Sequence, residues 1–196
     1  MYIVVEGIDT CGKSTQIDLL QEAYPQAIIT KEPGATELGS KIRELVLFSD
    51  DLCPVTELLL FLADRSNHAS NVIKPNLGRL IISDRSLISG MAYALASKKF
   101  DFDWLKTLNQ FAMQNIMPEA IILFEIQEKT LHERLGGKDH DVIEQRGIEY
   151  MLDVQRQLNY VCTTLGIETL IIKAEDSIEK IHHQITHFIE TKAKHT

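Results

Sequence analysis

The chain has 196 residues, of which 44% are hydrophobic and 24% are charged, and its formal net charge at pH 7 is −8. This length suits one domain, residues 1–196, with a single sizeable core. The negative charge argues against broad binding to nucleic acids or anionic membranes, and the apolar stretches are too short for a membrane span. Three cysteines without paired spacing predict free thiols. We therefore expect an acidic, cytoplasmic, globular protein.

The first element along the chain is a strand that leads into a phosphate-binding loop. Residues 2–5 are apolar and rich in β-branched side chains, and GIDTCGKS at 7–14 fits the pattern G-x-x-x-x-G-K-[ST]. Helix-like residues at 15–22 complete the context that this motif needs. The backbone amides of such a loop surround phosphate oxygens, while Lys13 can reach the β- and γ-phosphates and Ser14 can bind Mg²⁺. The residues assigned to binding a nucleoside triphosphate are Gly7, Ile8, Asp9, Thr10, Cys11, Gly12, Lys13, Ser14 and Thr15.

Strand-like and helix-like segments alternate along the chain. Apolar runs predict strands at 2–6, 27–30, 80–83, 120–126 and 169–173. Apolar residues at helical spacing predict helices at 57–73, 87–96, 104–116, 143–165 and 177–192. Such alternation is typical of a parallel sheet covered on both faces. The predicted fold is α/β: a P-loop NTP hydrolase-like, three-layer fold with a five-stranded parallel sheet flanked by helices on both faces.

The third predicted strand ends in the polar sequence SDRS at 83–86. Ligands of parallel α/β sheets bind beyond the carboxyl ends of the strands. Asp84 is therefore a candidate, together with Ser14, for holding Mg²⁺. Arg85 is a candidate for binding a phosphoryl group through two hydrogen bonds. A local surface ion pair between Asp84 and Arg85 is the simpler alternative.

Four segments are informative as a set. They read EGIDTCGKSTQ at 6–16, TKEPGAT at 30–36, LLLFLADR at 58–65 and DRSLISGMAY at 84–93. Together, and in this order, they resemble bacterial thymidylate kinase over nearly the full chain. The resemblance implies ATP- and Mg²⁺-dependent phosphorylation of dTMP to dTDP, in dTTP biosynthesis. It also implies a homodimer formed by helix packing. Apolar residues of the two helical segments 57–73 and 87–96 are candidates for that interface, and they would suit the protein's own core as well.

The resemblance implies roles for individual residues at the acceptor site. Phe61 would stack on thymine, Arg65 would hydrogen-bond the base, and Tyr93 would pack against the deoxyribose and exclude a 2′-hydroxyl. Asp9 would contact the sugar hydroxyl or the acceptor phosphate, and Glu6 would support the site from the strand end. Core packing is the alternative role for Phe61 and Tyr93, and a surface ion pair with Asp64 is the alternative for Arg65. The implied dTMP-binding residues are Asp9, Lys31, Pro33, Phe61, Arg65, Arg85, Ser89, Gly90 and Tyr93.

The implied reaction requires no general base from the protein, because the acceptor phosphate is already nucleophilic near neutral pH. Catalysis is expected from in-line positioning and from neutralising charge on the transferring group. The candidate catalytic residues are Lys13, Arg85, Asp9, Arg134 and Lys138.

Four departures from the family pattern affect these expectations. Lys31 replaces an arginine and loses its two-pronged geometry, Ala35 replaces a glycine, and Ser86 stands where a tyrosine is usual. The fourth departure is the absence of a catalytic arginine. The family pattern places one either in the phosphate loop or in the lid, and here those positions hold Thr10 and Val142.

A mobile lid is expected at about 134–144, where Gly136 and Gly137 favour flexibility. Arg134, Lys138 and Arg146 are the cations that could replace the missing arginine, and slow turnover is expected.

Three alternative functions remain at this point. A kinase for another nucleoside monophosphate is the nearest, and dUMP is expected to be a poorer substrate because a methyl group contributes only about 1–3 kcal/mol of discrimination. A GTPase-like switch would need an N-K-x-D motif, which the sequence lacks. A P-loop kinase for another metabolite would have no use for Phe61 and Arg65 at their spacing. ATP and dTMP are the expected ligands, with neither nucleic acid nor membrane as a partner.

Overall fold

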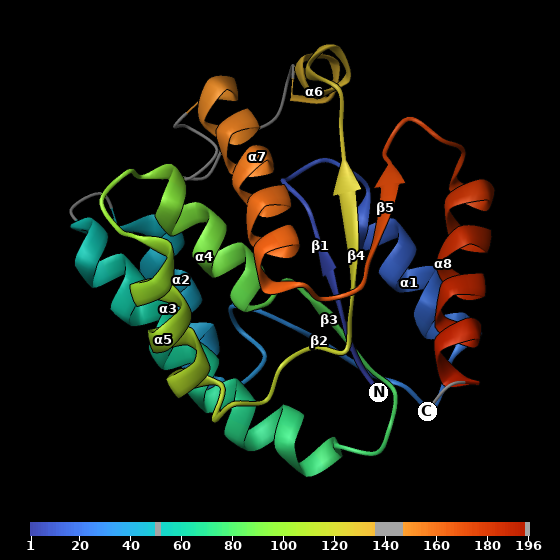
Figure 1. Cartoon of the computed structure of the whole chain (residues 1–196), viewed down its shortest axis with the longest axis horizontal. Coiled ribbons are helices and arrows are strands. Elements are labelled where there is room, and N and C mark those ends of the chain that lie inside the picture. The colour runs from blue at the N-terminus through green and yellow to red at the C-terminus, as the bar shows by residue number, and fades with distance from the viewer. Residues whose placement is uncertain (50–51, 136–146, 195–196) are drawn as a thin grey trace.

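A five-stranded parallel sheet organises the protein (Figure 1). In this computed structural model, which describes residues 1–49, 52–135 and 147–194, the strands lie in the spatial order β2-β3-β1-β4-β5. Their bounds are Tyr2–Glu6 for β1, Ile28–Lys31 for β2, Ile81–Asp84 for β3, Ala120–Glu125 for β4 and Thr169–Lys173 for β5. The predicted α/β fold with a parallel sheet of five strands is confirmed.

The central strands are buried along nearly their whole length. Every residue of β1 is buried, and so is β4 from its first residue, Ala120, to Phe124. Ile3 of β1 lies opposite Ile82 of β3 on one side and Ala120 of β4 on the other. Strands with apolar side chains on both faces are stable only between two layers of helices, which fixes the three-layer arrangement.

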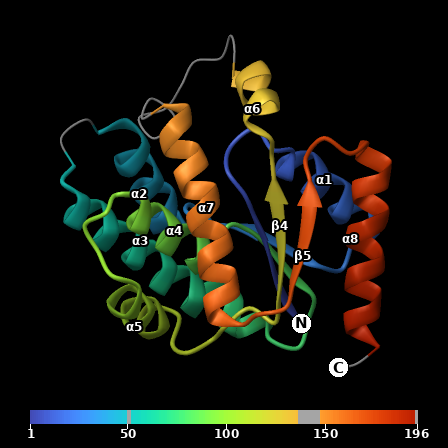
Figure 2. The ribbon, with the colours of Figure 1, turned by 45° about the horizontal axis from the view of Figure 1, so that its top comes forward.

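The helices form the two outer layers of the molecule. Their bounds are α1 Lys13–Ala23, α2 Glu37–Phe48, α3 Pro54–His68, α4 Leu87–Ala96, α5 Phe102–Ala112, α6 Glu128–Leu135, α7 Ile148–Leu165 and α8 Ile178–Ala193. Helices α1 and α8 pack together on one face of the sheet, whereas α4 and α7 pack together on the other, with α3 and α5 beside α4 (Figures 1 and 2). None of the described helices is long and apolar enough to cross a membrane.

The structure differs from the sequence-based expectation mainly in its helices. The sequence predicted neither α2 nor α6, because few of their residues are buried and their apolar stripes are narrow. The helix expected at 57–73 begins at Pro54, a residue that suits a first helical turn, and after His68 continues as a π-helical turn, Ala69–Ile73. Of the helix expected at 143–165, residues 143–146 lie outside the described residues, and α7 begins at Ile148.

Polar caps begin α2 and α4, the helices that follow β2 and β3 at the carboxyl edge of the sheet. Thr36 Oγ1 accepts a hydrogen bond of 2.9 Å from the backbone N–H of Gly39 at the start of α2. Ser86 Oγ accepts one of 3.1 Å from the backbone N–H of Ile88 at the start of α4. Such caps satisfy backbone donors that the first helical turn leaves unpaired. They fix where α2 and α4 begin, directly beside the ends of β2 and β3.

Candidate active site

The loop between β1 and α1 has the geometry of a phosphate cradle. Gly7 and Gly12 have φ angles of 147° and 100°, and a Cβ on Gly7 would lie 2.9 Å from Cβ of Phe124, so glycine is required there. The buried Lys13 donates from Nζ to the carbonyl oxygens of Gly7 at 3.0 Å and Ile8 at 2.9 Å. The ammonium therefore lies across the loop at the N-terminus of α1, where backbone amides also attract anions.

A polar cleft extends from this loop to the end of β3. The residues that line it are Asp9, Thr10, Gly12, Lys13, Ser14, Thr15, Lys31, Glu32, Arg43, Asp84 and Arg85. Of the residues assigned to ATP binding, Ile8 and Cys11 are buried beneath the loop and shape it from behind. Arg43 on α2 is a cation that the sequence analysis missed, because it did not predict the helix that carries it.

The two residues assigned to Mg²⁺ both line the cleft. Asp84 Oδ1 is buried and has no hydrogen-bond partner among the described residues, and the exposed Ser14 contributes its hydroxyl to the same cavities. A buried carboxylate oxygen without a donor is costly unless a cation satisfies it. Oxygen ligands of this kind suit Mg²⁺. The residues present therefore fit the expected metal ion.

Arg85 and Asp9 form an ion pair where the cleft meets the end of β3. Arg85 adopts a φ of 67° and donates to Asp9 Oδ1 at 2.6 Å, to the carbonyl oxygen of Gly7 at 2.9 Å and to Ser89 Oγ at 3.1 Å. Burial alone would raise the pKa of Asp9, but the charges of Arg85 and Lys13 together lower it. Asp9 is thus an ionised acceptor, and Arg85 is bound to the phosphate loop instead of extending into solvent.

A buried carboxylate, Glu6, lies behind this ion pair. Ser86 Oγ donates to Glu6 Oε1 at 2.6 Å, and Ser89 Oγ donates to Glu6 Oε2. Burial raises the pKa of Glu6 to about 7, against the opposing effect of the two serine hydroxyls and of the Arg85 charge. Ser86, at a position where the sequence resemblance led us to expect tyrosine, thus has two tasks here: it caps α4 and donates a hydrogen bond to Glu6.

A second, more apolar cavity adjoins the cleft. The residues that line it are Asp9, Glu32, Pro33, Arg43, Leu47, Phe61, Arg65, Arg85, Ser86, Ser89, Gly90 and Tyr93. It therefore brings together every residue assigned to the acceptor site except Lys31, which lines the polar cleft instead. The Tyr93 ring lies beneath Arg85, with 5.5 Å between its centroid and Cζ. The sequence analysis missed Glu32, Arg43, Leu47 and Ser86, whose contribution depends on packing between distant segments.

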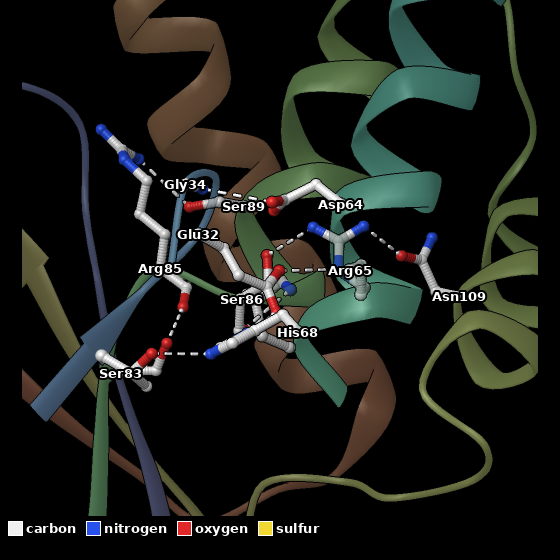
Figure 3. A network of polar contacts seen from close by, with 12 residues as sticks. Glu32, Gly34, Asp64, Arg65, His68, Ser83, Arg85, Ser86, Ser89 and Asn109 are labelled. Carbon is white, nitrogen blue, oxygen red and sulfur yellow. Dashed lines mark hydrogen bonds and ion pairs between the residues drawn. The ribbon is translucent and has the colours of Figure 1, made fainter. Parts of the chain in front are cut away.

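Arg65 enters this cavity from a buried network of polar contacts (Figure 3). Its Nε donates to Glu32 Oε2 at 2.9 Å, its Nη1 to Asn109 Oδ1 at 2.8 Å and its Nη2 to the carbonyl oxygen of Ser86 at 3.1 Å. His68 Nδ1 lies 2.8 Å from the other oxygen of Glu32. The ion pair that the sequence suggested between Arg65 and its preceding aspartate is replaced by this pair with Glu32.

Charge within the network is balanced at Glu32. Burial would raise the pKa of this carboxyl, but the Arg65 guanidinium and His68 together lower it. Because an ionised carboxylate only accepts hydrogen bonds, His68 carries its proton on Nδ1. On the opposite side of the ring, His68 Nε2 lies 2.7 Å from Thr30 Oγ1 on β2. The network therefore connects β2 with α3, and, through Ser86 and Asn109, with α4 and α5.

The cations proposed for the lid are only partly described. Arg134, in the last turn of α6, donates to the carbonyl oxygens of Thr10 at 3.0 Å and Ala174 at 2.8 Å. It thus contacts the backbone of the phosphate loop at Thr10. Beyond α6, the rest of the expected lid lies outside the described residues, including Gly136, Gly137, Lys138, Val142 and the neighbouring Arg146.

The fold and the site together define the class of protein to which this chain belongs. A phosphate loop between β1 and α1 opens into a cleft, and that cleft joins a partly apolar cavity suited to a second ligand. This arrangement is typical of P-loop phosphotransferases.

Comparisons with known proteins identify the family within this class. The family model for thymidylate kinase matches residues 5–185. A thymidylate kinase from Wolinella succinogenes is 52% identical over 94% of this chain and 96% of its own, and one from Sulfurovum sp. strain NBC37-1 is 47% identical over 97% of this chain and all of its own. The crystal structure of thymidylate kinase from Ehrlichia chaffeensis shares the fold, with a TM-score of 0.77 over 96% of this chain and 98% of that one at 24% identity. The chain belongs to the thymidylate kinase family.

The raised pKa of Glu6 predicts how stability depends on pH. Because the folded state binds this proton more tightly, the contribution of Glu6 to the free energy of unfolding falls as pH rises from about 4.5 to about 7. The Glu6→Gln side chain does not ionise, so the variant does not lose stability in this way. The free energy of unfolding of the variant minus that of the natural protein should therefore rise by up to about 3 kcal/mol between pH 5 and pH 8. Urea denaturation at both pH values measures this; a difference that does not change with pH contradicts it.

Gly90 gives a second prediction, because it faces the guanidinium of Arg65. A Cβ at this position would lie 2.6 Å from Nη2, 2.8 Å from Nη1 and 3.0 Å from Cζ. In an open helix, alanine in place of glycine adds about 0.5–1 kcal/mol of stability. Here Arg65 is held by three hydrogen bonds and cannot move aside, so Gly90→Ala should instead lower the free energy of unfolding by about 1–3 kcal/mol. An increase in stability would show that the guanidinium is not fixed.

Proposed function

We propose that this protein transfers the γ-phosphoryl group of ATP to the 5′-phosphate of dTMP, giving ADP and dTDP. A phosphate oxygen of dTMP forms a bond to the γ-phosphorus as the bond from that phosphorus to the bridging oxygen of ADP breaks. The observation that carries the proposal is that the polar cleft and the apolar cavity share four residues, Asp9, Glu32, Arg43 and Arg85. The two substrates would therefore meet at charged side chains that belong to both sites.

The phosphate loop would bind the triphosphate. Lys13 uses two of its three N–H donors on loop carbonyls, and the third has only a weak contact with Cys11 Sγ at 3.9 Å. That third donor suits a phosphate oxygen. Mg²⁺ held by Ser14 and Asp84 would reduce the negative charge of the triphosphate. Arg85, placed between the cavities, would bind the transferring group or the acceptor phosphate, and its pairing with Asp9 fixes its direction.

The apolar cavity would bind the nucleoside part of dTMP. Phe61 is half-buried on its wall, which suits stacking on a pyrimidine, and Tyr93 lies beside Arg85 where a sugar would follow the phosphate. Arg65 supplies hydrogen-bond donors at the inner end. Pro33, Ser89 and Gly90 complete the lining.

We also propose that residues 134–144 act as a lid over the cleft. Among its cations, Arg134 contacts the phosphate loop through a carbonyl oxygen, which favours a role in holding the loop over a role in touching the phosphates. Lys138 in the lid and Arg146 just after it are then the cations proposed to contact the transferring group. The expected location of the enzyme is the cytoplasm, where its nucleotide substrates are.

A homodimer is proposed through α2 and α3. These helices carry large apolar side chains that are about half exposed or more, whereas most apolar side chains of α4 are buried within the protein. The exposed residues are Leu38, Leu45, Phe48, Val55 and Leu59. Helices α2 and α3 contact each other, and large exposed apolar side chains gathered on neighbouring elements favour a protein interface.

The activity is tested by measuring ADP release from ATP and Mg²⁺ with dTMP, dUMP, ribothymidine monophosphate, dCMP and dGMP offered separately. dTMP should be strongly preferred, with dUMP poorer by about 10- to 200-fold because it lacks one methyl group. Lys13→Met, which removes the ammonium from the loop, is the control for contaminating kinases. Binding of ATP without turnover of any acceptor would contradict the proposed acceptor.

The dimer is tested by sedimentation velocity. Phe48, 72% exposed on α2, should be central to the interface, so Phe48→Glu should shift the protein from dimer to monomer because it places a charge in an apolar contact. Ile171, 51% exposed on the edge strand β5, offers a matched control, and Ile171→Glu should leave the dimer intact. Equal sedimentation of all three proteins as monomers would exclude the interface.

A further inference from the structure

Asn109 is a fully buried polar residue on α5 to which neither the sequence motifs nor the cavity lining assign a role. Its Oδ1 accepts a hydrogen bond of 2.8 Å from Nη1 of Arg65, and its Nδ2 donates to the carbonyl oxygen of Leu105 at 2.8 Å. The side chain does not line the acceptor cavity. Asn109 can therefore act on a ligand only through Arg65, whose guanidinium it contacts in Figure 3.

The hydrogen bonds of Arg65 leave a defined pair of donors. A guanidinium has five N–H groups; Glu32 takes the one on Nε, Asn109 takes one on Nη1, and the carbonyl oxygen of Ser86 takes one on Nη2. One donor remains on each terminal nitrogen. Among the described residues, Asn109 is the only hydrogen-bond partner of Nη1, and its bond is the third that holds the planar group, after those from Glu32 and the carbonyl oxygen of Ser86. Gly90 lies against both terminal nitrogens, which prevents the group from tilting toward α4.

A fixed guanidinium selects among pyrimidines by chemistry alone. It offers only donors, so it binds a ring position that carries a carbonyl oxygen and opposes one that carries an amino group. A polar group held in a buried site discriminates strongly, because the wrong partner leaves it unpaired. If the group could rotate, its donors could find other partners and the discrimination would weaken.

We propose that Asn109 is a positioning residue for base selection: by fixing the plane of Arg65, it makes the enzyme prefer a 4-oxo pyrimidine over a 4-amino pyrimidine. The inference rests on the proposed acceptor site and deepens it. The bond to Leu105 does not account for a buried asparagine here. Asn159 on α7 makes the same type of bond, to the carbonyl oxygen of Gln155 four residues earlier, without contacting an arginine.

The test measures kcat and KM for dTMP and dCMP, with ATP saturating, in variants at position 109. Asn109→Leu keeps the branched shape of the side chain at a somewhat larger volume and removes the acceptor, and Asn109→Ala removes the acceptor without overpacking, should the leucine variant fail to fold. The ratio of kcat/KM for dTMP to that for dCMP should fall by about 10- to 100-fold in both, the equivalent of one hydrogen bond to a charged group. Most of this loss should lie in KM for dTMP, with KM for ATP unchanged. Asn109→Asp, which keeps an acceptor for Nη1, should retain the preference within about threefold.

Asn159→Leu is the matched control, because it loses the same intrahelical bond away from Arg65. It should leave the dTMP to dCMP ratio unchanged. If the Asn109 variants lower both acceptors equally, or keep the natural ratio while folded, the positioning role is wrong and Asn109 is only structural. If the natural enzyme itself does not prefer dTMP over dCMP, the proposed contact of Arg65 with the base fails, and this inference fails with it.

Discussion

The site depends above all on the buried ion pair between Glu32 and Arg65. Both side chains are at most 3% exposed, and removing one partner of such a pair typically costs about 3–5 kcal/mol because it leaves an uncompensated charge. The pair is also where separate parts of the chain meet: Glu32 follows β2, Arg65 lies on α3, and their further partners lie at the start of α4 and on α5. The shape of the acceptor cavity therefore follows from one electrostatic requirement, that each buried charge has its partners.

Charge is distributed so that an acidic protein can bind polyanions. The chain carries a net charge of −8, yet Lys13, Arg43 and Arg85 all line one cleft. Asp9 and Asp84 lie among them. Asp9 is paired with Arg85, whereas one carboxylate oxygen of Asp84, Oδ1, has no hydrogen-bond partner among the described residues. Local arrangement, not net charge, decides what the cleft attracts. The parallel sheet produces this arrangement, because its strands end together at one edge.

The sequence predicted those parts of the site that are contiguous in the chain. The phosphate loop, and the pair Phe61 and Arg65 on one helix, are local patterns, and the structure places them at the cleft and the cavity. Asn109 and Glu32 escaped prediction because their role arises from contacts with Arg65, 44 and 33 residues away in sequence. The strands were predicted well since continuous apolar runs define them. Helix α2 was not predicted, as its narrow buried stripe gives little periodic signal, and Arg43 was missed with it.

The central claim is that Arg65 reads the ligand while remaining held by Glu32 and Asn109. A high-resolution crystal structure with dTMP bound tests it most directly. The account predicts that both hydrogen bonds persist at their present lengths of 2.9 Å and 2.8 Å, with a remaining N–H of Arg65 within hydrogen-bond distance of the carbonyl oxygen at position 4 of thymine. A structure in which Arg65 leaves Glu32 and Asn109 to reach the base, or in which the base binds without touching Arg65, would contradict it.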